Sequence, residues 1–184
     1  AADAWASRQP ATTGRRNPDR PLSVGVAAPW PPQQSGVADF TAATIGELAR
    51  LCDVTLYTTA DADPQSCLPE GVSVGHAPVE VLLSGSHDHD VLVSVVGNSH
   101  FHLPAIELLK AHAAVVVTHD TRLTEFYLAH LGPGGLERLM LRGKSAESLT
   151  PPLDEQIDDM RLLQSTAFWE VARRATRLVA HTPT

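Results

Sequence analysis

Short runs of apolar residues alternate along the chain with longer segments in which apolar residues recur every three or four positions. The first run, Leu22–Ala28, is apolar throughout, as expected of a strand buried on both faces of a sheet. Further strands are expected at Asp53–Thr58, Gly71–His76, Asp90–Val96, Ala113–Thr118 and Thr176–His181. Strands that alternate with helices pair in parallel through right-handed crossovers, so the pattern predicts an α/β domain.

The helix expected after the first strand carries apolar or small residues at intervals of three and four: Val37, Phe40, Thr44, Leu48 and Leu51. This stripe is predicted to lie on the sheet. Other helices are expected at His102–His112, Arg122–Leu131, Gly135–Lys144 and Asp154–Arg174, and Pro78–Ser84 suits a short helix or a strand. A break is expected at residues 132–135 and a polar link at Ser145–Pro152.

The length of 184 residues, 43% of them hydrophobic, suits one well-packed domain, which we place at residues 21–184. Residues 1–20 contain no apolar segment of the kind found in secretory signals and are expected to form a flexible extension. The chain stops directly after its last predicted strand, with no helix to cover it. We therefore expect further polypeptide to follow in the natural protein.

The formal charge of -7 offers no overall basic field to a nucleic acid, so no nucleic-acid partner is expected. Cys52 and Cys67 are too few for a disulfide framework and favour a reduced, cytoplasmic setting. Seven cations gather in the last third of the chain, and a solvated helical face is favoured over an acidic or membrane-surface partner. These cations are Arg138, Arg142, Lys144, Arg161, Arg173, Arg174 and Arg177.

The first candidate binding loop is Pro-rich and ends in Ser35-Gly36, directly before a predicted helix. A helix N-terminus and a glycine without a side chain, placed at the carboxyl end of a strand, suit a phosphate group. The alternative is that Gly36 serves only a tight turn between strand and helix. The spacing of glycines matches neither the dinucleotide-binding fingerprint nor a P-loop.

Two more loops follow predicted strands and are expected to open on the same edge of the sheet. The first of them carries Asn98, Ser99, His100 and His102. The second carries His119, which could bond a sugar hydroxyl or a phosphate oxygen, exchange a proton, or be a buried histidine bonded to a carbonyl. Asp120 could orient the His119 ring or cap the next helix.

Two histidine-rich segments, His87-Asp88-His89 and His100-Phe101-His102, raise a metal hypothesis. The cysteines do not extend either segment into a recognisable zinc pattern, so no metal is assigned. Residues 86–90 are instead expected to form a solvated loop. Trp30 either stacks on a sugar face or folds its loop against the domain.

Two parts of the chain together resemble a known family. The segment APWPPQQSGVADFTAATIGELARLCDVTLYT is similar to the opening of retaining glycosyltransferases of the GT-B type, family four. GNSHFHLPAIELLKAHAAVVVTHD is similar to the family's later Gly-Asn-Ser turn and its Val-Val-x-x-His-Asp strand end, and RLVAHT to the last strand before its interdomain connection. The resemblance covers Leu22–Thr182.

The resemblance implies a Rossmann-like, mostly parallel sheet with helices on both faces, the N-terminal half of a GT-B architecture whose donor-binding C-terminal domain is absent here. Such enzymes transfer a sugar from a nucleotide-diphosphate donor to a sugar or lipid-linked acceptor. No cofactor is expected for this domain. Gly36 with Ser35 would then lie near the donor diphosphate, and His119, the candidate catalytic residue, would contact the transferred sugar.

On the same resemblance, Asn98, His100 and Asp120 belong to the substrate-binding set, with the first two on the acceptor side. Thr124–Arg174 would shape acceptor specificity, which leaves open a peripheral contact with the inner face of a membrane. This chain alone is expected to be inactive. Two alternatives remain: a non-catalytic domain that binds a nucleotide or sugar phosphate, and a histidine-dependent metallohydrolase.

Overall fold

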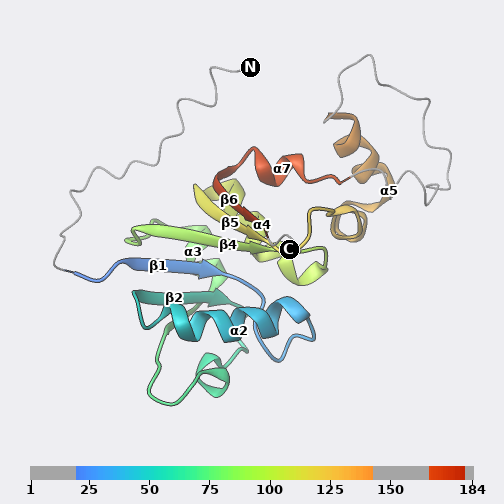
Figure 1. The fold of residues 1–184 in the computed structure, drawn as a ribbon. Helices are drawn as coiled ribbons and strands as arrows, with labels where there is room; N and C mark the ends of the chain where they lie inside the picture. Colours follow the sequence, from blue (N-terminus) through green and yellow to red (C-terminus); the bar gives the residue numbers. More distant parts are fainter. Residues whose placement is uncertain (1–19, 143–165, 181–184) are drawn as a thin grey trace.

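A computed structural model describes residues 20–142 and 166–180, and within them six parallel strands form one central sheet (Figure 1). The strands are β1 (Ser23–Ala27), β2 (Asp53–Thr58), β3 (Gly75–Pro78), β4 (Val91–Val96), β5 (Ala114–Thr118) and β6 (Ala175–Ala180). Their order is β3-β2-β1-β4-β5-β6. This is the Rossmann-like order, so the predicted α/β fold is confirmed.

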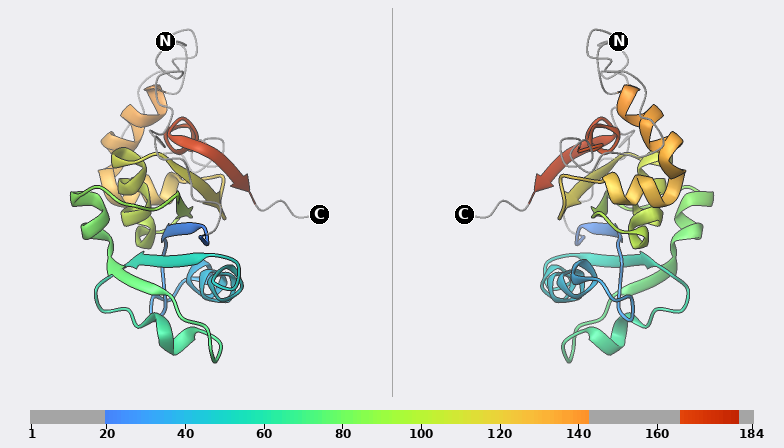
Figure 2. Two further views of the ribbon diagram at one scale, coloured as in Figure 1. Left: turned by 90° about the vertical axis from the view of Figure 1, so that its left-hand side faces the viewer. Right: turned by 90° about the vertical axis from the view of Figure 1, so that its right-hand side faces the viewer.

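The chain progresses from β1 toward β3 in one direction and from β4 toward β6 in the other. Right-handed crossovers therefore place helices on opposite faces of the two halves. Helix α2 (Gly36–Leu48) covers one face over β1 and β2 (Figure 2). The other face is covered by α3 (Val79–Ser84), α4 (Leu103–Ala111), α5 (Thr124–Arg142) and α7 (Trp169–Ala172).

Five of the predicted strands agree with the structure to within about one residue over the part described. The third strand is wrong: Gly71–His76 was expected, whereas β3 begins at Gly75 and pairs Gly75 with Thr55. Gly71 instead adopts a positive φ of 79°, which turns the chain before the strand begins. A short 3-10 helix, η1 (Pro64–Cys67), lies in the preceding loop.

The apolar stripe predicted for α2 is wrong in part: Val37 and Leu48 pack against the core, but Thr44 is exposed. Phe40, and Leu51 just beyond the helix, are 39% and 81% exposed, and the helix buries a face made mainly of small residues. That face consists of Ala38, Thr41, Ala42, Ile45 and Gly46. Small side chains let a helix approach a sheet closely, but they give a weak hydrophobic pattern in the sequence.

The predicted break after Leu131 is confirmed: α5 kinks at Gly132, whose backbone has φ 68° and ψ 175°. The predicted polar link and most of the helix Asp154–Arg174 lie outside the described residues. Where that helix can be checked it is confirmed only in part, because residues 166–168 are not helical and Ala167 has a φ of 49°. Only α7 is helical there.

The ambiguous segment Pro78–Ser84 is helical over α3. Of the expected extension, residues 1–20, all but the last residue lie outside the described part; that residue, Arg20, pairs with Asp90 at 2.7 Å. Among the described residues, none of the helices combines the length and the apolar character that crossing a membrane requires.

Candidate functional site

The loops after β1, β4 and β5 lie at the carboxyl edge of three neighbouring strands, where the strand order reverses between β1 and β4. Such a switch point opens a crevice in which α/β proteins bind ligands. The last two loops are joined directly. The backbone N–H of His119 donates to the Val96 carbonyl at 2.9 Å, and the Asn98 N–H donates to Asp120 Oδ2 at 2.9 Å.

The first loop ends at the N-terminus of α2, where Ser35 is the cap. Its Oγ accepts the Val37 N–H at 3.3 Å. Gly36 is exposed, and a Cβ built on it would meet no atom within 4 Å. Its φ is not in the left-handed region, so a turn does not require glycine at this position. The backbone at Gly36 is therefore open to an approaching group.

A shallow hollow lies beside this N-terminus and is lined by the Pro-rich loop, Gly36 and Asp39. The helix dipole and the first backbone N–H groups favour an anion here. The Asp39 carboxylate opposes one, because it stands in the first turn of the same helix. Any phosphate would therefore bind on the backbone side, away from Asp39.

His119 is half-buried beside this helix. Its ring lies edge-on to that of Phe40, with centroids 4.6 Å apart. Phe40 follows Gly36 by four residues, about one helical turn. The structure thus brings the first turn of α2 and the end of β5 together on one rim.

Asn98 and Asp120 both make hydrogen bonds that hold the rim together. The Asn98 side-chain oxygen accepts the backbone N–H of Phe126 at 3.1 Å, so Asn98 caps the start of α5. Asp120 is exposed; it fixes the Asn98 backbone, and its own carbonyl accepts the Thr118 hydroxyl at 2.5 Å. These hydrogen bonds hold the loops after β4 and β5 together and to the start of α5.

The buried histidine bonded to a carbonyl, considered for His119, is found at His102. This ring is 1% exposed, its Nδ1 lies 3.1 Å from the Val95 carbonyl, and burial lowers its pKa to about 4. His102 therefore stays neutral near physiological pH. It supports the rim but does not reach a ligand.

Gly97 is the residue of this site that sequence reasoning undervalued. A Cβ there would stand 2.6 Å from His102 Nε2 and 3.2 Å from Asp120 Oδ2. A side chain at this position cannot coexist with the present arrangement of the rim. The available signal was a glycine directly after a buried strand, in the Gly-Asn-Ser turn.

The other two residues of this loop differ in exposure. His100 is exposed on the 3-10 helix η2 (His100–His102) and packs against the Phe101 ring, with centroids 4.0 Å apart. The Ser99 hydroxyl is buried and makes no hydrogen bond within the described part of the chain. His100 is thus the most accessible side chain of this loop.

The segment expected to be a solvated loop is instead packed against the sheet. His89 lies over β1, with Nδ1 2.9 Å from the Ser23 hydroxyl and Nε2 2.7 Å from that of Tyr57. His87 stacks on His89 and contacts the His112 ring, with centroid distances of 5.9 and 5.1 Å. Burial lowers the pKa of both His87 and His89.

His89 is bonded to two hydroxyl groups, and His112 Nε2 lies 2.8 Å from the Leu82 carbonyl, whereas His87 Nδ1 is buried without a hydrogen-bond partner among the described residues. Over residues 20–142 and 166–180, the structure contains no group of three or more His, Cys, Asp or Glu side chains that could hold a metal ion. Trp30 is fully buried in the core beneath α2, in agreement with the interpretation that its loop folds against the domain.

Comparison of the chain with protein-family models, with curated proteins and with solved structures found no match.

Proposed function

We propose that this chain is the N-terminal domain of a retaining glycosyltransferase of the GT-B type, which transfers a sugar from a nucleotide-diphosphate donor to an acceptor. The observation that carries the proposal is the contact between Phe40 and His119. It brings an unobstructed helix N-terminus and a histidine at a strand end to one crevice. The sequence resemblance to that family supplies the reaction.

The chemistry needs positive dipoles and hydrogen-bond donors where a nucleoside diphosphate departs. Backbone N–H groups at Gly36 supply these without a metal ion, provided that no side chain blocks them. His119 is the catalytic candidate, because a half-buried imidazole at this rim can donate to a hydroxyl of the transferred sugar. Retention of configuration asks for no strong general base from this domain.

On the acceptor side, His100 is the exposed candidate, whereas Asn98 and Asp120 hold the loop that presents it. The acceptor is a sugar or a lipid-linked sugar. A second, C-terminal domain of the same polypeptide would supply the main nucleotide contacts, so the isolated chain is expected to be inactive.

The test uses the natural polypeptide that carries this domain, incubated with UDP- and GDP-linked hexoses and a panel of sugar acceptors. We expect consumption of one donor and a product with the donor's anomeric configuration, read by NMR. In parallel, amide spectra of the isotope-labelled chain with the same donors should shift at Gly36 and His119. The proposal would be refuted if the natural polypeptide showed no turnover and the chain showed no shifts at these two positions.

The alternative is a domain that binds a nucleotide or sugar phosphate at the same rim without catalysis. The crevice at the switch point suits it equally, because that position binds ligands in many α/β folds. Amide shifts at Gly36 and His119 without transfer by the natural polypeptide would favour this alternative.

A further inference from the structure

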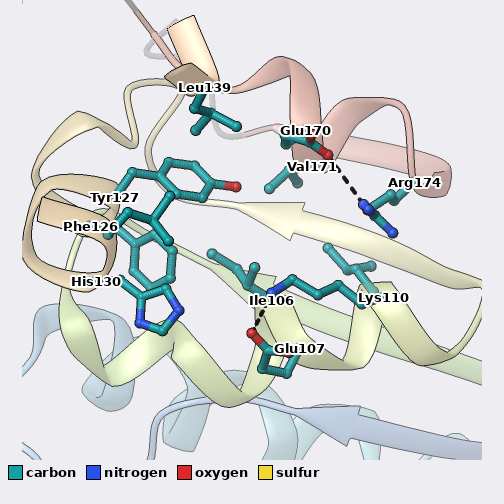
Figure 3. A pocket seen from close by; sticks show the side chains of 12 residues that line it. Ile106, Glu107, Lys110, Phe126, Tyr127, His130, Leu139, Glu170, Val171 and Arg174 are labelled. Carbon is teal, nitrogen blue, oxygen red and sulfur yellow. Dashed lines mark hydrogen bonds and ion pairs between the residues drawn. The ribbon is translucent and has the colours of Figure 1, made fainter. Parts of the chain in front are cut away.

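A cavity of about 220 Å³ lies on the outer face of the domain, between α4, α5 and α7 (Figure 3). None of the loops of the rim described above lines it. Its nearest connection to that rim is Phe126, whose backbone N–H bonds Asn98. The cavity is therefore separate from that rim, although much of its lining belongs to Thr124–Arg174, the segment to which the family resemblance gives a role in acceptor specificity.

The floor of the cavity is apolar and rigidly packed. Ile106, Leu139 and Val171 are each less than a tenth exposed and belong to the main core. Phe126 and Tyr127 form one wall, with their rings edge-to-face and centroids 5.0 Å apart. An apolar group placed here would replace water on a surface that the core already holds in shape.

Charged groups surround the open side, in pairs whose cation is the more exposed partner. Lys110 bonds Glu107 at 2.5 Å, with side-chain exposures of 49% and 34%. Arg174 bonds Glu170 at 3.3 Å, with exposures of 23% and 14%. Arg173 also bonds Glu170 at 2.5 Å but does not line the cavity, so the lining itself carries two cations and two carboxylates. Because the cation is the more exposed partner in each pair, an entering group meets positive charge first.

One polar group inside the cavity adds directionality. Tyr127 is 6% exposed, and in Figure 3 its hydroxyl points from α5 across the cavity toward α7. Burial, and then the nearby Glu170, raise the pKa of Tyr127 to about 12. The phenol thus stays protonated at physiological pH and can donate a hydrogen bond to an anionic group held between Lys110 and Arg174.

We propose that this cavity binds a small arylalkyl monocarboxylate, with its ring on the apolar floor and its carboxylate between Lys110 and Arg174. A dry cavity of about 150 Å³ accepts a benzene ring, so this volume suits one ring with a short linker. Arginine matches a carboxylate with two parallel hydrogen bonds. The proposal does not depend on the transferase function.

The test titrates the full chain with phenylpropionate, phenylpropanol and phenylpropylamine, which share one skeleton and differ in head-group charge. Binding is followed by amide NMR shifts at Phe126 and Val171. We expect phenylpropionate to bind with a Kd of about 0.1–1 mM, as its size allows, and about tenfold or more tightly than phenylpropanol. Phenylpropylamine should bind most weakly.

Variants then identify the groups responsible. Arg174→Gln leaves Glu170 paired with Arg173 and should remove the about tenfold preference for the carboxylate. Tyr127→Phe keeps the aromatic ring and removes the hydroxyl, so it should weaken the binding of phenylpropionate but not that of the other two ligands. Arg50→Gln is the control, because it removes the arginine of another exposed helical ion pair, with Glu47 on α2, outside the cavity.

Two results would overturn the proposal. One is the absence of shifts at Phe126 and Val171 at 10 times the expected Kd, or about 10 mM. The other is equal binding of the acid, the alcohol and the amine, which would leave an apolar cavity with no preference for an anion. Thermal midpoints of the variants within a few degrees of the parent show that the fold is kept.

Discussion

The ring of Phe40 on α2 stands edge-on to the imidazole of His119 at the end of β5, at an interplanar angle of 74°. The two residues come from elements on either side of the switch point between β1 and β4. Their contact joins the helix N-terminus that favours an anion to the histidine that can donate to a sugar. A ligand bound at one of them is therefore within reach of the other.

Replacing His119 should separate catalysis from stability. In the natural polypeptide that carries this domain, His119→Ala should lower turnover about 100-fold or more, the typical cost of losing one donor to a developing charge. The thermal midpoint should change little, because the ring is only half-buried. His76→Ala, at an exposed histidine on β3, is the control and should leave turnover unchanged. A large fall in the His119→Ala midpoint would instead make this histidine structural.

Gly36→Val should obstruct a diphosphate at the start of α2 without disturbing the fold. The new side chain meets no protein atom within 4 Å of its Cβ, so any effect on donor affinity reports on the ligand. We expect the donor Kd, measured by titration calorimetry, to rise about tenfold, which corresponds to one lost hydrogen bond to a charged group. Gly134→Val, at another exposed glycine with open space around its Cβ, should leave the Kd unchanged. Equal affinities for all three proteins would remove Gly36 from the site.

Asp39→Asn should have the opposite effect on the same ligand. The carboxylate lines the hollow at the N-terminus of α2, where it repels an anion. Its neutralisation should tighten diphosphate binding several-fold at low salt and lower the helix stability by about 0.3–1 kcal/mol, since an acidic first turn favours a helix. The gain in affinity should fade as salt is added. Weaker binding by Asp39→Asn would show that the ligand's phosphate does not lie at this N-terminus.

The protonation of His102 should make the free energy of unfolding depend on pH. Its native pKa of about 4 lies below its ordinary value, so the unfolded state binds a proton more readily. The contribution of neutral His102 to the free energy of unfolding is fully present above about pH 6.5. It is lost as the pH falls from there toward 4, by up to about 3 kcal/mol. His87 and His89, whose pKa values are also lowered, add to the loss in the same direction.

Urea unfolding at several pH values between 7.5 and 4, about the span over which His102 titrates, checks this expectation. His102→Asn keeps a donor near the Val95 carbonyl and removes the titration, so it should be less stable at neutral pH but lose less stability on acidification. An unaltered pH slope in this variant would assign the acid sensitivity to other groups.

The parts of the fold that could be predicted are those that depend on the pattern of neighbouring residues in the sequence. The runs at β1, β4 and β5 consist of consecutive apolar residues, and residues of this kind have few stable positions other than a buried parallel strand. Their order along the chain then fixed which loops share an edge. The position of Gly36 and His119 on one rim followed from that alone.

The errors concern contacts between distant residues. Apart from Ile45, the buried face of α2 consists of alanine, threonine and glycine, which allow close packing but give a weak hydrophobic pattern. His89 reads as polar, yet Ser23 and Tyr57, far away in the sequence, accommodate it in the interior. Likewise, the residues next to Asn98 in the sequence do not indicate that it caps α5 by accepting the N–H of Phe126, 28 residues later.

Gly97→Ala should show how tightly the rim is assembled. Even one methyl group would stand 2.6 Å from His102 Nε2 and 3.2 Å from Asp120 Oδ2, and both neighbours are held by other bonds. Overpacking of this kind costs about 1–3 kcal/mol, which we expect as a lower urea midpoint. Gly36→Ala is the matched control and should change stability by less than about 0.5 kcal/mol, because its Cβ meets open space. If Gly97→Ala were as stable as the parent, His102 and Asp120 could move apart, and the rim would not be the rigid platform that a preorganised site requires.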